Sequence, residues 1–162
     1  MFLEAPVDAW YGWLGAAILS VGLAGMAVAL PTTPPPDATG AANALEAVAA
    51  SPGSTVTYSH QAESSRFGRT TLSLRNDGGV SHAEIAFGRI VPAAGNERLV
   101  ALVAGATPAT IYGNRSAGAW RELLEADIER VGSVTAGWTP STGTLRARSL
   151  SVDGQTVVFV DE

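Results

Sequence analysis

The chain has 162 residues, of which 46% are hydrophobic and only 15% charged, and its net charge is −5. This length accommodates a membrane anchor followed by one domain of about 120 residues. The lack of cysteine excludes disulfide and thiolate chemistry, and the acidic balance without a basic patch argues against nucleic acid as a partner.

All ten basic residues are arginine. Lysine carries a strongly hydrated ammonium group, and arginine differs from it in geometry and hydration. The bias is typical of a salt-adapted proteome, and the codon usage of a GC-rich genome explains it equally well.

Residues 10–30 predict a transmembrane helix, which follows an acidic tail formed by residues 1–9. The stretch is uncharged, and about 20 apolar residues span a bilayer as a helix. Trp10, Tyr11 and Trp13 are expected at the membrane interface, because amphipathic rings favour the headgroup level. The sequence therefore predicts contact with membrane lipid.

A cleaved signal peptide is the alternative interpretation of this segment. The tail before it has no basic residue, whereas a secretory signal begins with a positively charged region. The first arginine, Arg66, is too far away to set the orientation by the positive-inside rule. A short tail before a large C-terminal domain favours a single-pass protein of the cell membrane with its domain outside.

Four small residues recur at every fourth position of this helix: Gly12, Ala16, Ser20 and Ala24. Small residues at this spacing let two helix backbones approach closely in a membrane. They predict a packing face for a partner helix, although an Ala/Gly-rich helix also produces such columns by chance.

A proline-rich linker, residues 31–40, is expected to lead into a globular domain formed by residues 41–162. Proline-rich segments are extended, with a rise of about 3.1 Å per residue. The domain begins with a helical composition at residues 41–50, and alternation of apolar and polar residues then predicts strands at 54–60 and 70–76.

The stretch 75–88, RNDGGVSHAEIAFG, mixes acidic residues, glycines and a histidine. Asp77, Gly78 and Gly79 separate two alternating apolar runs, which predicts a β-hairpin whose turn needs positive φ angles. A second hairpin is predicted at Asp153-Gly154.

Two further segments complete the predicted domain. The continuous apolar run at residues 99–104 is consistent with a strand buried on both faces. Residues 116–132 predict an amphipathic helix with one apolar face, and its carboxylates, Asp127 among them, are expected to form a solvated acidic face. The fold class is therefore expected to be α+β, with an antiparallel sheet of about five or six strands packed on this helix.

No catalytic, cofactor or metal site is predicted from the motifs. His82 and Glu84 share one strand face, but two ligands on a sheet surface do not make a metal site. His60, aligned with Val56 and Tyr58, is expected to be a partly buried, hydrogen-bonded side chain. No G-x-S-x-G elbow, P-loop or strand-linked G-x-G-x-x-G is present, so an enzyme is not expected.

Two residues are candidates for other roles. Asn114 opens an N-x-S sequon, which predicts glycosylation if the domain is extracellular, while helix capping explains the same residues equally well. Trp138 lies in the loop sequence GWTP and is the one tryptophan expected neither in a membrane belt nor in a helix core. It is the candidate ligand contact.

Several stretches together resemble a known family. They are D-A-W-Y-x-W-L, a span ending in L-P, T-V-T-Y-S-H and R-F-G-R-T-T-L-S-L-R-N-D-G-G-V-S-H-A-E-I-A-F-G. The chain resembles an uncharacterised haloarchaeal family of small single-span membrane proteins encoded near type IV pilus-like or secretion ATPase genes. The resemblance covers nearly the whole chain and is most specific at residues 54–92. It implies no activity and no catalytic residues.

The resemblance implies a non-catalytic, membrane-anchored accessory component of an archaeal pilus-like or secretion system, with protein partners in that complex. A major filament subunit is not expected, because the prepilin cleavage signal is absent and prolines interrupt the helix. The alternative is a membrane-tethered extracellular binding module for a polysaccharide or solute, which requires a pocket with convergent polar groups.

Overall fold

The computed structural model describes residues 8–29, 33–86, 88–113, 117–132 and 137–162. The chain divides into two compact units, Met1–Thr33 and Pro34–Glu162. Asn114, the candidate glycosylation site, lies outside the described residues. Residues 30–32, which include the first proline of the linker, also lie outside them.

The first unit contains helix α1, Asp8–Ala29. Trp10, Tyr11 and Trp13 are 65%, 68% and 78% exposed. Within the helix, the Ser20 hydroxyl donates a hydrogen bond to the Ala16 carbonyl at 2.8 Å. The helix therefore forms where the apolar run predicts one.

Among the described residues, no helix combines the length and the apolar character that crossing a membrane requires. The prediction of a transmembrane helix at residues 10–30 is wrong, and with it the predicted single-pass location in the cell membrane. Gly12, Gly15, Gly22 and Gly25 are interspersed through α1 and contribute little apolar surface. The lack of charge alone does not make the described part of this segment a membrane-spanning helix.

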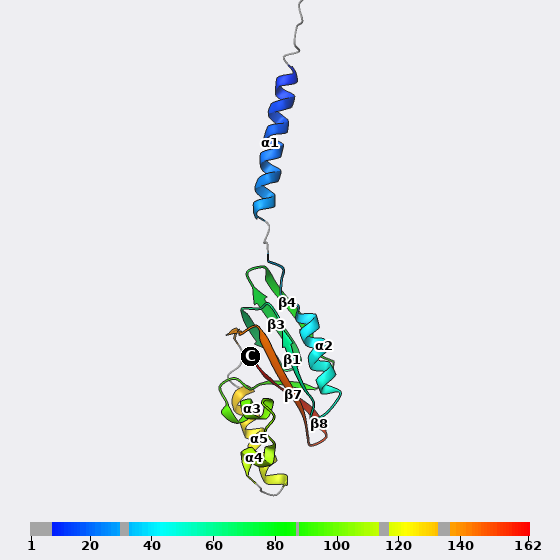
Figure 1. Ribbon diagram of the computed structural model, residues 1–162, viewed down its shortest axis with the longest axis vertical. Helices are drawn as coiled ribbons and strands as arrows, with labels where there is room; N and C mark the ends of the chain where they lie inside the picture. Colours follow the sequence, from blue (N-terminus) through cyan, green and yellow to red (C-terminus); the bar gives the residue numbers. More distant parts are fainter. Residues whose placement is uncertain (1–7, 30–32, 87, 114–116, 133–136) are drawn as a thin grey trace, which may run out of the picture. The chain divides into compact units, whose positions relative to one another are not determined.

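The second unit contains four helices and eight strands in its described part (Figure 1). The helices are α2 Ala38–Ala49, α3 Glu97–Val103, α4 Pro108–Tyr112 and α5 Ala117–Gly132. The strands are β1 Thr55–Ser59, β2 Ser64–Phe67, β3 Thr71–Asn76, β4 Gly79–Glu84, β5 Arg89–Pro92, β6 Thr139–Pro140, β7 Thr144–Val152 and β8 Gln155–Asp161.

The strands form two four-stranded sheets. The central sheet has the order β1-β7-β8-β5, and the outer sheet has the order β4-β3-β2-β6. All pairs are antiparallel except β5 with β8, which is parallel. The expectation of a single antiparallel sheet packed on one helix is therefore wrong. Strands β2, β5 and β6 have only two to four residues, which is too short for a clear alternation of apolar and polar residues in the sequence.

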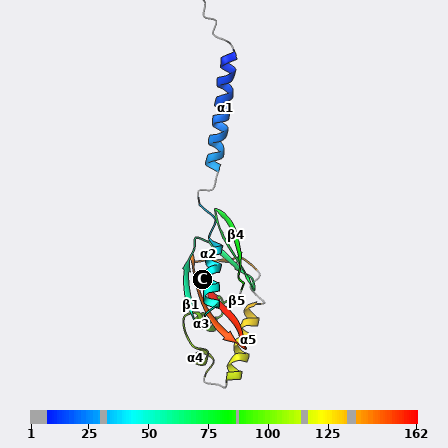
Figure 2. The same ribbon diagram turned by 90° about the vertical axis from the view of Figure 1, so that its right-hand side faces the viewer.

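The central sheet is covered on both faces, which explains the apolar composition of β8. Val158 and Val160 face a core shared with α2 and the inner face of the outer sheet. Val157 and Phe159 face a second core shared with α3, α4 and α5. In Figure 1, α3, α4 and α5 lie together at the lower end of the domain, apart from α2, and Figure 2 shows α4 and α5 below α2 from the side.

Helix α2 begins at a cap formed by Asp37, whose Oδ1 accepts a hydrogen bond from the Gly40 amide at 2.8 Å. Its buried residues recur at helical spacing and are mostly alanine, so the helix can approach the sheets closely. The Tyr58 hydroxyl of β1 also donates to Asp37, at 3.1 Å. The helix starts earlier than the predicted residue 41, because Asp37 caps it.

Residues 99–103 of the apolar run are helical and Ala104 caps the end of the helix, so the predicted buried strand at 99–104 is wrong. Asn96 Oδ1 accepts hydrogen bonds from the amides of Arg98 and Leu99, at 3.0 and 3.4 Å, and thereby starts α3. Leu99, Leu102 and Val103 are buried, which is the i, i+3, i+4 pattern of a helix face. Periodicity does not separate a buried strand from a buried helix in so short a run.

Both predicted hairpins are confirmed. Strands β3 and β4 pair around Asp77 and Gly78, and the Asn76 side chain accepts a hydrogen bond from the Gly78 amide at 2.9 Å. Of Asp77, Gly78 and Gly79, which were predicted to form the turn, only Gly79 has a positive φ angle, 140°. Asp153 and Gly154, between β7 and β8, have φ angles of 49° and 78°, as a type I′ turn requires.

The helical assignment of residues 97–103 predicts unequal costs for two substitutions. Leu102→Ala removes a fully buried side chain and should lower the free energy of unfolding by about 2 to 5 kcal/mol. Val100→Ala, at a partly buried position, should cost clearly less. Urea unfolding followed by circular dichroism measures both, and a larger loss for Val100→Ala would contradict this assignment.

Candidate functional site

A cavity of about 320 Å³ opens beside Trp138, where an edge of the outer sheet meets the central sheet. Phe67 and Trp138 supply aromatic walls, and Pro92 and Val160 supply aliphatic walls. Glu162 is the one ionisable residue among the described lining residues. Small-ligand sites combine mostly apolar walls with a few placed polar groups, and this cavity has that composition.

The pairing of β2 with β6 positions Trp138. Ser64 lies opposite Pro140, and Ser65 lies opposite Thr139. The Thr139 hydroxyl donates to the Ser65 carbonyl at 3.2 Å, and the Ser141 amide donates to the Glu63 carbonyl at 2.9 Å. These hydrogen bonds hold β6 in place and thereby fix the position of Trp138, which directly precedes β6.

Two arginines pack on the indole ring of Trp138. The guanidinium carbons of Arg66 and Arg75 lie 5.1 and 4.6 Å from the ring centroid. Arg75 Nε also donates to the Ser64 hydroxyl at 3.1 Å. Trp138, the candidate ligand contact, is consequently half-buried.

Glu162 connects the two sheets behind the cavity. Its Oε1 lies 2.9 Å from His60 Nε2, and its Oε2 accepts a hydrogen bond from the Ser65 hydroxyl. The Ala62 amide donates to His60 Nδ1 at 3.2 Å, so Nε2 carries the hydrogen of the neutral ring and donates it to Glu162. The His60 side chain is hydrogen-bonded, as predicted, and it is completely buried, whereas the sequence predicted partial burial.

The three residues do not have the geometry of a nucleophilic triad. A serine nucleophile needs a base that takes its proton and a third group that orients the base. Here both Ser65 and His60 bond to the same carboxylate, and Ser65 is fully buried. The arrangement holds the Glu162 carboxylate in one orientation at the cavity wall.

His82 and Glu84 lie on the exposed face of β4, as the hairpin pattern predicted. His82 Nδ1 is 2.8 Å from the Ser73 hydroxyl of the neighbouring strand. Among the described residues, no group of three or more histidine and carboxylate side chains is arranged to hold a metal ion.

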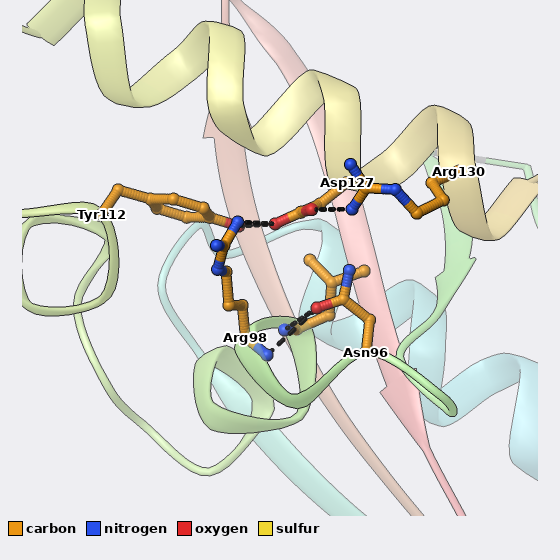
Figure 3. Close-up of polar contacts among 6 residues, drawn as sticks. Asn96, Arg98, Tyr112, Asp127 and Arg130 are labelled. Carbon is orange, nitrogen blue, oxygen red and sulfur yellow. Dashed lines mark hydrogen bonds and ion pairs between the residues drawn. The ribbon is translucent and has the colours of Figure 1, made fainter.

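A second polar cluster, shown in Figure 3, joins α3, α4 and α5 around Asp127. The carboxylate accepts hydrogen bonds from the Tyr112 hydroxyl at 3.0 Å, from Arg98 at 3.3 Å and from Arg130 at 2.5 Å. Asp127 is only 1% exposed, so its predicted place on a solvated acidic face is wrong. A signal was present, because Asp127 lies three residues after Leu124 and four before Val131, on the buried side of the helix.

The electrostatics of this cluster follow from burial and charge. Burial raises the pKa of Asp127, but hydrogen bonds from Tyr112, Arg130 and Arg98 lower it by more, so the net pKa falls below the ordinary value. Burial, together with the Asp127 carboxylate, raises the pKa of Tyr112 above its ordinary value. Asp127 is therefore ionised and Tyr112 is neutral at pH 7. Their hydrogen bonds stabilise the contact between α3, α4 and α5.

Residues 4–150 match the model of a family of unknown function, DUF7283, and the chain belongs to that family. No curated protein and no solved structure matches the chain.

Removal of the Asp127 carboxylate should destabilise the domain. Asp127→Ala leaves three donors without their acceptor, at a cost of about 2 kcal/mol or more in the free energy of unfolding. Glu122→Ala removes the same charge from an exposed position of α5 and should change stability by about 0.5 kcal/mol or less. Chemical unfolding at pH 7 compares the two, and equal effects would contradict the structural role of Asp127.

The lowered pKa of Asp127 also predicts a pH dependence. A carboxyl group whose folded-state pKa is depressed contributes stability that is present above its unfolded pKa, about 3.9, and lost as pH falls through the folded value. The stability difference between the wild type and Asp127→Asn should therefore shrink below about pH 4. A difference that stays constant from pH 6 to pH 2 would argue against this ionisation.

Proposed function

We propose that the domain Pro34–Glu162 is a non-catalytic binding module, and that the cavity beside Trp138 holds its ligand. The observation that supports this function is the cavity of about 320 Å³, with two aromatic residues and one fixed carboxylate in its walls. The ligand class that fits is a polysaccharide unit or another hydroxylated solute.

Each wall of the cavity has a matching feature in such a ligand. The apolar face of a sugar ring packs on accessible lining side chains such as Trp138 and Pro140, because both surfaces leave water. Hydroxyl groups of the ring donate hydrogen bonds, and a carboxylate offers about four acceptor positions, of which His60 and Ser65 take two at Glu162. The remaining positions are available to the ligand.

The fixed orientation of Glu162 favours recognition over chemistry. A site that is ordered before binding loses less conformational entropy when the ligand arrives. His60, which directly follows β1 of the central sheet, and Ser65, in β2 of the outer sheet, supply that order. Ser65 donates to Glu162 and not to His60, and its side chain is fully buried, which supports binding as the function.

The role of this module in a cell is a further part of the proposal. An accessory role in an archaeal pilus-like or secretion system rests on the family resemblance alone, as do a haloarchaeal origin and protein partners in such a complex. A binding module is compatible with that role.

Truncation of the aromatic wall tests the function. In a screen of an immobilised glycan array and a library of small polyols, the full-length chain should bind at least one ligand, and Trp138→Ala should weaken it by about 2 kcal/mol, roughly thirtyfold in Kd. Trp13→Ala removes the same side chain from an exposed position of α1 and should bind like the wild type. Thermal unfolding shows whether each variant remains folded.

Two results would contradict the proposal. The first is a ligand that binds equally well to the wild type and to a folded Trp138→Ala. The second is a screen in which the wild type retains none of the glycans or polyols.

A further inference from the structure

The outer sheet carries a pair of like charges on its exposed face. Arg66 of β2 and Arg75 of β3 are both exposed and both lie over the indole of Trp138. Arg66 pairs with Ser73, and Arg75 pairs with Ser64, so the two arginines occupy diagonal positions on the same face. Diagonal positions on adjacent strands lie about 7 to 8 Å apart, within reach of long side chains, and the two guanidinium carbons lie 5.1 and 4.6 Å from the centroid of the same ring.

Neither arginine has an acidic partner among the described residues. The ion pairs of this part of the chain involve other arginines, and the one polar partner of Arg75 is the Ser64 hydroxyl. The chain as a whole has a net charge of −5, so acidic side chains are in excess elsewhere. The two arginines thus form a positive pair that no ion pair neutralises in the described part of the chain, and Glu84 lines the same surface hollow as Arg66.

The strand register shows what else faces the same side. One row across the sheet contains His82, Ser73 and Arg66, and the next row contains Val80, Arg75 and Ser64. Glu84 lies at the far end of β4, opposite Thr71, and forms no ion pair with Arg66. His82, which bonds to Ser73, is the nearest other titratable group in the row of Arg66.

This arrangement favours an oxyanion. The ring of Trp138 attracts both guanidinium groups through its negative face, which favours these positions of the two side chains but does not neutralise their charge. A planar guanidinium matches the geometry of a carboxylate, which can accept two parallel hydrogen bonds. With Arg75 Nε already bonded to Ser64, the outer nitrogens of Arg75 are left for a ligand.

We propose that Arg66 and Arg75 form an anion subsite beside the Trp138 cavity, and that the ligand of the module is an acidic polysaccharide. The inference rests on the proposed function and narrows its ligand class. The sugar ring enters the cavity, where its hydroxyl groups meet Glu162. Its carboxylate, or that of the next sugar unit, binds to the two arginines on the outer face. Trp138 belongs to both parts of the site, because it lines the cavity and carries the arginines.

Two polymers, one of galacturonate and one of galactose, distinguish the anion subsite from the cavity. Polygalacturonate carries a carboxylate on each unit, and galactan is its neutral counterpart. Isothermal titration of the full-length chain with polygalacturonate should show binding that weakens as salt is raised. The double variant R66Q/R75Q should weaken it about tenfold or more, because charge-assisted hydrogen bonds are lost.

Arg146→Gln provides the control for net charge. Arg146 is exposed on β7 of the other sheet, and the variant should bind polygalacturonate like the wild type. Trp138→Ala should weaken binding of both polymers.

The outcomes separate the two proposals. Galactan binding that equals polygalacturonate binding, depends on Trp138 and is unchanged in R66Q/R75Q would overturn the anion subsite and leave the binding module intact. Polygalacturonate binding that a folded Trp138→Ala retains in full would overturn both. Failure of the wild type to bind polygalacturonate at low salt would also overturn the inference of an acidic ligand.

Discussion

The burial of β8 on both of its faces is the constraint on which the rest of the domain depends. Val157 and Phe159 on one face, and Val158 and Val160 on the other, are almost completely buried. Two separate sets of elements must therefore cover the central sheet. Helices α3, α4 and α5 cover one face, and α2 with the outer sheet covers the other.

The same constraint places the candidate site. Because side chains alternate along a strand, Val158, Val160 and Glu162 point toward the outer sheet. The burial of Val158 and Val160 thus places the Glu162 carboxylate in the wall of the cavity. His60 from the central sheet and Ser65 from the outer sheet then meet at Glu162, so one carboxylate both joins the sheets and forms part of the cavity wall.

The sequence predicted the features that depend on local chemistry. Both hairpins and α5 have long periodic runs, and their turns or ends carry residues suited to them. It failed where the structure depends on distant partners. The segment 97–103 resembles a strand in composition, and the burial of Asp127 depends on arginine and tyrosine side chains from other segments. Trp138 was predicted as a contact, but its pairing with Arg66 and Arg75 follows from the β2–β6 register, which a two-residue strand does not reveal.

The central claim is that ligand binding converges on Trp138, and nuclear magnetic resonance tests it most directly. Each of the four tryptophans gives its own indole N–H signal, and arginine Nε–H groups give another set. Titration with a galacturonate oligosaccharide should shift the signals of Trp138, Arg66 and Arg75 and leave those of Trp10, Trp13 and Trp120 unchanged. Shifts that gather instead at Arg98 and Arg130, around Asp127, would contradict the account.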